Sequence, residues 1–188
     1  DLSVEIWFEA RDHNTLGGAV VGRSARRRLW MYSPEDEHEA RLRDLEALID
    51  QMIDVLADRL ESPLDAEEPG RLEDVIGQHQ GVSAGAGRLV ENMTSLVSAM
   101  STDSLTSDFF LDVLRGSLER LREHHDQEAA QLRQVVVGLK RTRRPELVLQ
   151  ILRGLNQEGV EETERAILDL KEQLDQSRED RILDQGRD

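Results

Sequence analysis

The sequence predicts an all-α fold in which long antiparallel helices form a bundle or an extended coiled-coil-like hairpin. Apolar residues recur at steps of three and four over stretches of about thirty residues, as they do in helices that pack through one face. Only 3% of the residues are aromatic and 34% are charged, which favours thin aliphatic contacts between helices over a thick sheet core. A chain of 188 residues is expected to form one domain, with or without an appendage.

The first 33 residues differ from the rest of the chain in charge and in pattern. They hold four acids and five arginines, a net charge of +1, so residues 34–188 carry −16 of the total of −15. In "LSVEIWFEA" apolar residues alternate from Val4 to Phe8 with a period of two, which is typical of a strand. "HNTLGGAVVG" supplies turn residues before "RRRLWMY". We expect a short β-hairpin or an extended arm that ends at Ser33.

The first predicted helix begins after this segment. In "SPEDE", Ser33 is a suitable N-cap, Pro34 suits the first helical position, and the acids favour the positive end of the helix dipole. Residues at helical spacing then follow: Leu42, Leu45, Ile49, Met52, Leu56 and Leu60. Ser62 and Pro63 are expected to end this helix.

A second helix is predicted from about 70 to 100, although "GVSAGAG" at 81–87 has the composition of a loop. Steps of three and four alternate without a break through Leu72, Val75, His79, Val82, Ala86, Leu89, Met93, Leu96 and Met100. A loop would have no reason to preserve this heptad phase. Each interior glycine costs about 1 kcal/mol relative to alanine, so the glycines are expected to be the weak point of the helix.

A third helix with Ser107 as its N-cap shows the same alternation. Its heptad positions are Leu111, Leu114, Leu118, Leu121, His125, Glu128, Leu132, Val135 and Leu139. If the second and third helices form an antiparallel hairpin about residues 101–107, the numbers of facing residues sum to about 210, and Ala86 faces His125. The sequence therefore predicts that His79, His125 and Glu128 share one polar layer, with His124 off the contact face.

The last part of the chain is predicted to contain two helices. Pro145 begins a short one in "PELVLQILRGL", and "NQEG" is expected to interrupt it. A final helix then carries Val160, Ile167, Leu170 and Leu174, and it leads into a charged tail. The helical bundle is thus expected over residues 34–184, with a polar tail at 185–188.

The predicted polar layer has a structural and a functional interpretation. Polar residues on a helix–helix contact fix the register at some cost in stability. Because histidine titrates near neutral pH, the layer could also respond to acid or to a ligand. A metal site is not expected, because Glu35 to His38 gives one Glu-x-x-His motif, whereas di-iron bundles use two such motifs and two further glutamates. No cofactor is expected.

Two further groups of residues are candidates for partner binding. The aromatic residues Trp7, Phe8, Trp30 and Tyr32 could anchor a partner or pack onto the bundle. The basic cluster Lys140, Arg141, Arg143 and Arg144 could hold a phosphate, an acidic partner or anionic lipid. Cations at the C-terminal end of a helix also complement its dipole, which is the simpler interpretation of this cluster.

Composition excludes several functional classes. The absence of cysteine excludes thiolate metal sites and disulfides, and a net charge of −15 argues against binding to nucleic acid. No apolar run approaches the roughly 20 residues of a membrane span, so a soluble protein is expected, and the cytoplasm is the favoured location. No phosphate-binding loop, nucleophile elbow or other catalytic motif is present, so the chain is not expected to be an enzyme.

The function expected from these observations is that of a non-catalytic helical interaction module, such as an adaptor, a scaffold, or a regulatory or structural subunit. It would bind other proteins through its helical contact faces and its aromatic arm, in a homo-oligomer or a hetero-complex. One alternative is a sensory or ligand-binding bundle, in which small residues opposite His125 leave a polar cavity. A metal-dependent bundle enzyme is a more distant alternative.

Overall fold

The structure is a computed structural model that describes residues 3–11, 21–30, 33–62, 71–139 and 145–185. The chain divides into two compact units, Asp1–Pro34 and Glu35–Asp188. The first unit thus ends one residue later than Ser33, the end of the N-terminal segment that we expected from the sequence.

The first unit is a β-hairpin built from two antiparallel ladders. Strand β1 (Ser3–Ile6) pairs with β4 (Arg27–Trp30), and β2 (Glu9–Arg11) pairs with β3 (Val21–Arg23). Two residues separate β1 from β2, whereas three separate β3 from β4, so the second chain segment carries one extra residue, a β-bulge. At the bulge the Ser24 amide donates to the Phe8 carbonyl over 2.9 Å, and the Phe8 amide donates to Ser24 Oγ over 2.8 Å.

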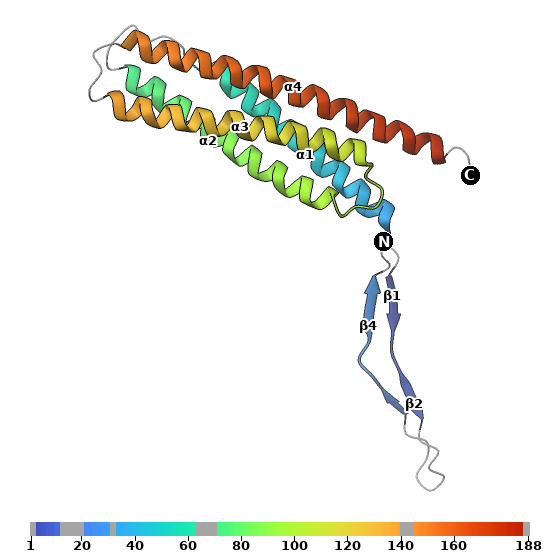
Figure 1. Cartoon of the computed structure of the whole chain (residues 1–188). Coiled ribbons are helices and arrows are strands. Elements are labelled where there is room, and N and C mark those ends of the chain that lie inside the picture. Colours follow the sequence, from blue (N-terminus) through green and yellow to red (C-terminus); the bar gives the residue numbers. More distant parts are fainter. Residues whose placement is uncertain (1–2, 12–20, 31–32, 63–70, 140–144, 186–188) are drawn as a thin grey trace. The chain divides into compact units, whose positions relative to one another are not determined.

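The second unit is a bundle of four helices, and Figure 1 shows them packed along one another. They are α1 (Pro34–Glu61), α2 (Arg71–Met100), α3 (Asp108–Leu139) and α4 (Pro145–Gln185). Successive helices are antiparallel: the start of α1 contacts the α2–α3 connection, with His38 Nδ1 2.6 Å from Asp103 Oδ2, and its middle contacts α2, with Asn92 Nδ2 2.8 Å from Gln51 Oε1. The predicted all-α bundle is confirmed. None of the helices described is long and apolar enough to cross a lipid bilayer.

The prediction of an unbroken second helix through "GVSAGAG" is correct. Helix α2 runs from Arg71 to Met100, and all nine residues of its heptad series are buried. The glycines differ in their surroundings: a Cβ at Gly81 would meet nothing within 4 Å, whereas one at Gly87 would lie 3.0 Å from Nε2 of His125. The small residues thus allow α3 to approach closely at Gly87.

Helix α3 begins where the sequence placed it. The Phe110 amide donates to Ser107 Oγ over 3.2 Å, so Ser107 is the N-cap. Seven residues of its heptad series are buried, and His125 is half-buried; the side chain of Leu139 is outside the description. Gly87 of α2 lies close to His125 of α3. This agrees with the predicted antiparallel pairing of the two helices, in which the numbers of facing residues sum to about 210.

The predicted contact face of α1 is wrong in its last two turns. Leu56 is only partly buried and Leu60 is 65% exposed, while Val55 and Arg59 are buried. After Met52 the buried positions continue by steps of three and four to Val55 and Arg59, so the face of α1 that meets its neighbours ends in an arginine. The sequence favoured the leucines because arginine is rarely buried without a partner.

The predicted interruption at "NQEG" is also wrong, because α4 is one helix of 41 residues that continues into the predicted charged tail. Its buried face passes through the expected break by steps of three and four: Leu152, Asn156, Gly159, Thr163, Ala166, Leu170 and Gln173. Asn156 and Gly159 do not end the helix, because both are used in packing against α1.

A buried polar layer separates the apolar core of the bundle into two clusters. One cluster draws on all four helices and includes Leu45, Met93, Leu114 and Leu170. The other lies among α2, α3 and α4 and includes Leu152. Helix α1 contributes nothing to the second cluster, and its last buried side chain, Arg59, enters the polar layer between them.

Candidate functional site

The centre of the polar layer is a buried ion pair between α1 and α3. Arg59 and Glu128 are 1% and 2% exposed, and the two guanidinium nitrogens Nη1 and Nη2 donate to the two carboxylate oxygens over 2.7 and 3.0 Å. The hydroxyl of Ser83, on α2, donates a further hydrogen bond to Glu128. Bidentate geometry and these additional bonds are what a buried ion pair needs to offset the loss of hydration.

Helix α4 is shaped to fit the Arg59 side chain and the end of α1. A Cβ at Gly159 would overlap the Arg59 guanidinium, so only glycine leaves room for it at this position. Asn156 Nδ2 donates to the Arg59 carbonyl over 2.9 Å. This carbonyl belongs to the last turn of α1 and also accepts a longer hydrogen bond, 3.3 Å, from the Ser62 amide. The "NQEG" sequence therefore serves the contact with α1.

Burial and charge set the protonation of the layer. Burial alone would raise the pKa of Glu128, but the hydrogen bonds and positive charge of Arg59 prevail and lower it, so this carboxylate is ionised. Burial lowers the pKa of His124, although Glu128 acts in the opposite direction. The folded state therefore holds His124 as a neutral imidazole next to an ionised pair.

The structure places the predicted layer residues in different surroundings. Glu128 is at the centre of the layer, and His79 is buried on α2, one turn before Ser83. His125 is half-buried against Gly87, with Nδ1 free of any hydrogen bond among the described residues. His124, which the heptad phase placed off the contact face, is 8% exposed. It is buried because α3 packs on α4 as well as on α2.

Sequence analysis missed Arg59, Asn156 and Gly159. For Asn156 and Gly159 the sequence holds a usable signal. The alternating steps of three and four that predict α2 also run through these two residues in α4. Arg59 could be found only by continuing the α1 series from Met52 through Val55, against two competing leucines.

A cleft of about 250 Å³ opens between α3 and α4 beside the polar layer. It is lined by Arg120, Glu123, His124, Gln127, Glu158, Glu161 and Glu162. Arg120 pairs with Asp169 over 2.8 Å and lies 3.5 Å from Glu162. The cleft is therefore acidic, and Arg120, the cation among these lining residues, is engaged by Asp169 and Glu162.

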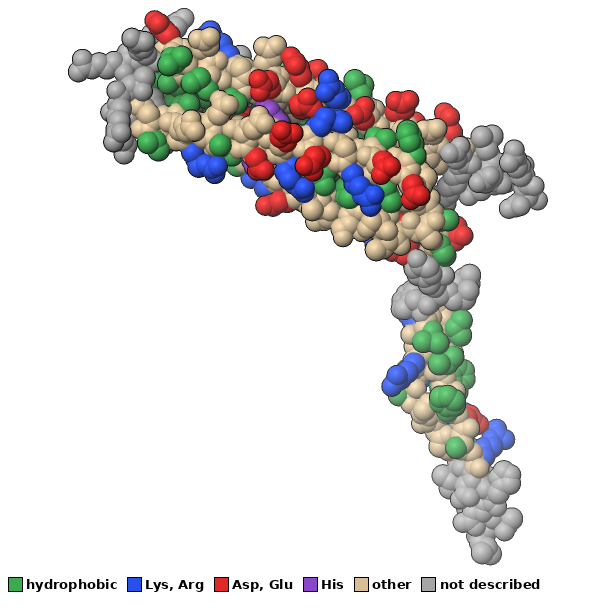
Figure 2. All heavy atoms as spheres, in the orientation of Figure 1, with side chains coloured by type: hydrophobic (Ala, Val, Ile, Leu, Met, Phe, Trp, Pro, Cys, Tyr) green, Lys and Arg blue, Asp and Glu red, His purple; other side chains and the backbone are tan. Residues whose placement is uncertain are grey.

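The hairpin presents two chemically different faces. Antiparallel partners share a face, so Val4 with Leu29 and Ile6 with Arg27 lie on one side, and Phe8 continues the alternation. The four apolar side chains on this face, those of Val4, Ile6, Phe8 and Leu29, are 40–78% exposed. Figure 2 shows hydrophobic side chains in a row along the hairpin.

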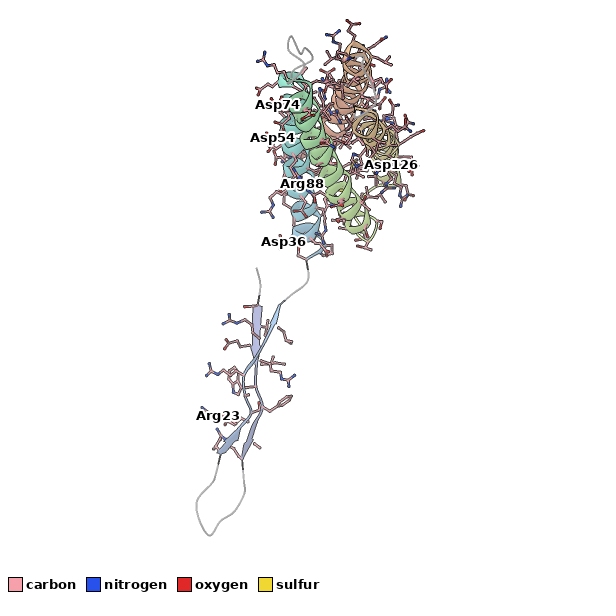
Figure 3. The ribbon with its side chains drawn as sticks, turned by 90° about the vertical axis from the view of Figure 1, so that its left-hand side faces the viewer. Arg23, Asp36, Asp54, Asp74, Arg88 and Asp126 are labelled. Atoms are coloured by element: carbon pink, nitrogen blue, oxygen red, sulfur yellow. The ribbon has the colours of Figure 1, made fainter. Side chains whose placement is uncertain are left out.

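The opposite face of the hairpin carries ion pairs between its strands. Glu5 pairs with Arg28 over 3.0 Å, and Glu9 pairs with Arg23 over 3.0 Å. Figure 3 shows Arg23 projecting from the hairpin. The Arg26 guanidinium lies 5.1 Å from the ring centroid of Trp7, a cation–π contact. Exposed pairs of this kind contribute about 0–1 kcal/mol each, so they do not replace a core.

The remaining predicted binding residues are only partly covered by the description. Trp7 and Phe8 are exposed in the hairpin. The backbone of Trp30 belongs to β4, but its side chain lies outside the described residues, as does Tyr32. The basic cluster Lys140, Arg141, Arg143 and Arg144 also lies outside them.

Metal ligands are not gathered in the part of the chain that the structure describes, where no group of three or more His, Asp or Glu side chains could hold an ion. His38, from the Glu-x-x-His motif, instead contacts Asp103, which also accepts hydrogen bonds from the Leu105 amide and the Thr106 hydroxyl. Burial would raise the pKa of Asp103, but these bonds prevail and lower it. This cluster fastens the α2–α3 connection to α1.

Comparisons with protein-family models, with curated proteins and with solved structures found no match to this chain.

The polar layer predicts a pH dependence of stability. Because the pKa of His124 is lowered in the folded state, the unfolded state binds the extra proton first, and the free energy of unfolding is expected to fall as the pH drops below about 6.5. The lowered pKa of Glu128 adds a separate loss at pH values below about 4.3, the ordinary value for glutamate. Urea unfolding at pH 7.5, 6.5 and 5.5 measures the first loss. It should be smaller in His124→Gln, and an unchanged pH dependence in that variant would contradict the assignment.

Proposed function

We propose that the protein is a non-catalytic interaction module whose hairpin docks on an acidic helical surface of a partner protein, the first candidate being the helical unit of a second copy. The observation that carries the proposal is the exposed apolar face of the hairpin. A two-stranded hairpin is only marginally stable in water. This one exposes four apolar side chains on one face, and none of its described residues covers them. Covering that face would stabilise both the hairpin and the complex.

Charge supports an acidic partner surface. The described hairpin residues include five arginines and two glutamates, a net charge of +3, whereas residues 34–188 carry −16. Arg27 lies on the apolar face, and no ion pair joins it to another described residue. Two hairpins packed through this face would bring arginines together with no carboxylate between them. An apolar surface bordered by carboxylates fits better.

The helical unit offers a surface with both properties. A groove of about 420 Å³ between α3 and α4 contains Phe109, which is 65% exposed, next to Val113. Its rim carries Asp112, Asp169 and Glu172 together with Arg120. Asp169 is paired with Arg120 over 2.8 Å and Asp112 lies 3.6 Å from Arg115, whereas Glu172 forms no ion pair with a described residue. We assign Phe8 of one copy to the apolar part of this groove and Arg27 to the rim carboxylates of the other copy.

Sedimentation velocity over a range of protein concentrations tests this assignment. The full chain is expected to self-associate, and Phe8→Asp should weaken the association at least about thirtyfold, because a buried aromatic anchor contributes about 2 kcal/mol or more. Trp7→Asp makes the same change in charge on the opposite face, so it should leave the association nearly unchanged.

Two results would count against the assignment. A chain that stays monomeric at all concentrations would exclude the second copy as partner. Equal losses in Phe8→Asp and Trp7→Asp would mean that charge or hairpin folding, and not the apolar face, controls association.

A further inference from the structure

The cleft between α3 and α4 holds an unusual combination of groups, which does not depend on the hairpin. Three of its glutamates, Glu123, Glu158 and Glu161, form no ion pair with any described residue. Glu162 differs, because it pairs with Arg165 over 3.2 Å and lies near Arg120. These three unpaired glutamates come from both helices, so their charges converge on the cleft. Glu123 and Glu161 each accept one hydrogen bond from a glutamine, Gln127 over 3.4 Å and Gln157 over 3.1 Å, and keep their negative charge uncompensated.

One of the residues that line the cleft, His124, provides a second, independent observation. His124 lines the cleft, is 8% exposed, and has its Nε2 buried without a hydrogen-bond partner among the described residues. Buried polar atoms in native proteins nearly always have a partner, so an orphan atom next to a cleft points to a missing ligand group. Oε2 of Glu162 is also buried without a hydrogen bond, but it lies 3.5 Å from Nε of Arg120 and is therefore not without a counter-charge.

We infer that this cleft binds a small organic cation, a guanidinium or a primary ammonium, whose N–H groups donate to the unpaired glutamates and to the imidazole of His124. A neutral imidazole offers one nitrogen as an acceptor, which suits a donor-only cation. The guanidinium of Arg59 is nearby, but Glu128 neutralises it through two hydrogen bonds. The volume of about 250 Å³ fits a ligand of few atoms.

An inorganic divalent ion fits the cleft less well. Such an ion needs several oxygen ligands within about 2.0–2.6 Å, and no described group of three or more carboxylate or imidazole side chains is arranged in that way. Organic cations spread their charge over several N–H groups, which can reach carboxylates on two helices at hydrogen-bond distance.

Isothermal titration calorimetry and amide NMR shifts of the full chain test the inference with four probes: agmatine, putrescine, N-acetyl-arginine amide and magnesium chloride. At least one organic cation is expected to bind saturably, with shifts concentrated at residues 120–127 and 158–162. Binding of agmatine or putrescine alone would indicate a free amine as the ligand. Binding of the arginine derivative as well would indicate that a basic side chain of a partner also fits.

Two variants of equal charge separate the cleft from general electrostatics. Glu158→Gln with Glu161→Gln is expected to weaken binding about tenfold or more, since each lost bond is charge-assisted. Asp50→Asn with Asp54→Asn removes two charges from the exposed side of α1 and should leave binding within about twofold; Figure 3 shows Asp54 on that helix.

Three outcomes would overturn the inference. One is the lack of saturable binding by any organic cation. Another is magnesium binding with the same shifts and equal affinity, which would indicate a diffuse counter-ion effect. The third is an equal loss in both double variants.

Discussion

Glu128→Ala is expected to lower the free energy of unfolding by about 3–5 kcal/mol, because it leaves the Arg59 guanidinium buried without a counter-charge. The change also removes the acceptor for the Ser83 hydroxyl. Urea unfolding at neutral pH measures the loss. The helical signal should persist in the native baseline, since the two apolar clusters remain intact on either side of the layer.

A double variant separates the value of the pair from the penalty for breaking it. Arg59→Met combined with Glu128→Leu replaces both charges by apolar side chains of similar size. We expect its stability to lie within about 1 kcal/mol of the wild type or above it, because the desolvation of both charges is avoided. If the double variant were less stable than Glu128→Ala, the layer would be stabilised by something other than the compensation of charge.

Gly159→Ala is expected to destabilise the bundle by about 1–3 kcal/mol, because the new methyl group overlaps the Arg59 guanidinium and displaces it from Glu128. Gly154→Ala is the matched control, five residues earlier on the same helix. A Cβ there meets nothing within 4 Å, so this change should stabilise α4 by up to about 1 kcal/mol through helix propensity alone. Thermal unfolding of both variants gives the comparison.

The opposite signs of these two changes are the essential result. If both alanines stabilised the protein, Arg59 would not pack on Gly159 as described. If both destabilised it, α4 would be sensitive to any added side chain, and the specific contact with α1 would not be needed to explain the effect.

The helices that the sequence predicted best are those whose heptad phase is unbroken. Helix α2 was recovered through its glycines because the positions on either side kept the same phase, and packing outweighed the low helix propensity of glycine. The same phase runs through Asn156 and Gly159, where the turn-forming composition of "NQEG" predicts an interruption instead. In α4 the glycine is required by a neighbouring side chain, which composition alone cannot reveal.

The candidate site was less predictable than the fold. The heptad phase placed Glu128 on a contact face, and it is buried there. Its partner Arg59 could not be identified, because sequence spacing within one helix says nothing about which residue of another helix lies opposite. The heptad phase that relates α3 to α2 leaves His124 off their contact face, but α4 covers the other side of α3 and buries this histidine.

The hairpin and the bundle have complementary properties, which is why association is central to the proposed function. The hairpin contributes exposed apolar side chains and positive charge, and the helical unit contributes an apolar groove with an acidic rim. The cation cleft lies further along the contact between α3 and α4 and uses different residues apart from Arg120. The two proposals can therefore succeed or fail separately.

The most direct test of the central claim is photo-cross-linking from position 8. Phe8 is replaced by a photoreactive phenylalanine analogue in the full chain, which is mixed with an isotope-labelled copy before irradiation so that mass spectrometry distinguishes links between copies from links within one. We predict links from position 8 of one copy to residues 109–116 or 169–176 of the other. Links confined to one chain, or none at all, would contradict docking of the hairpin on a second copy.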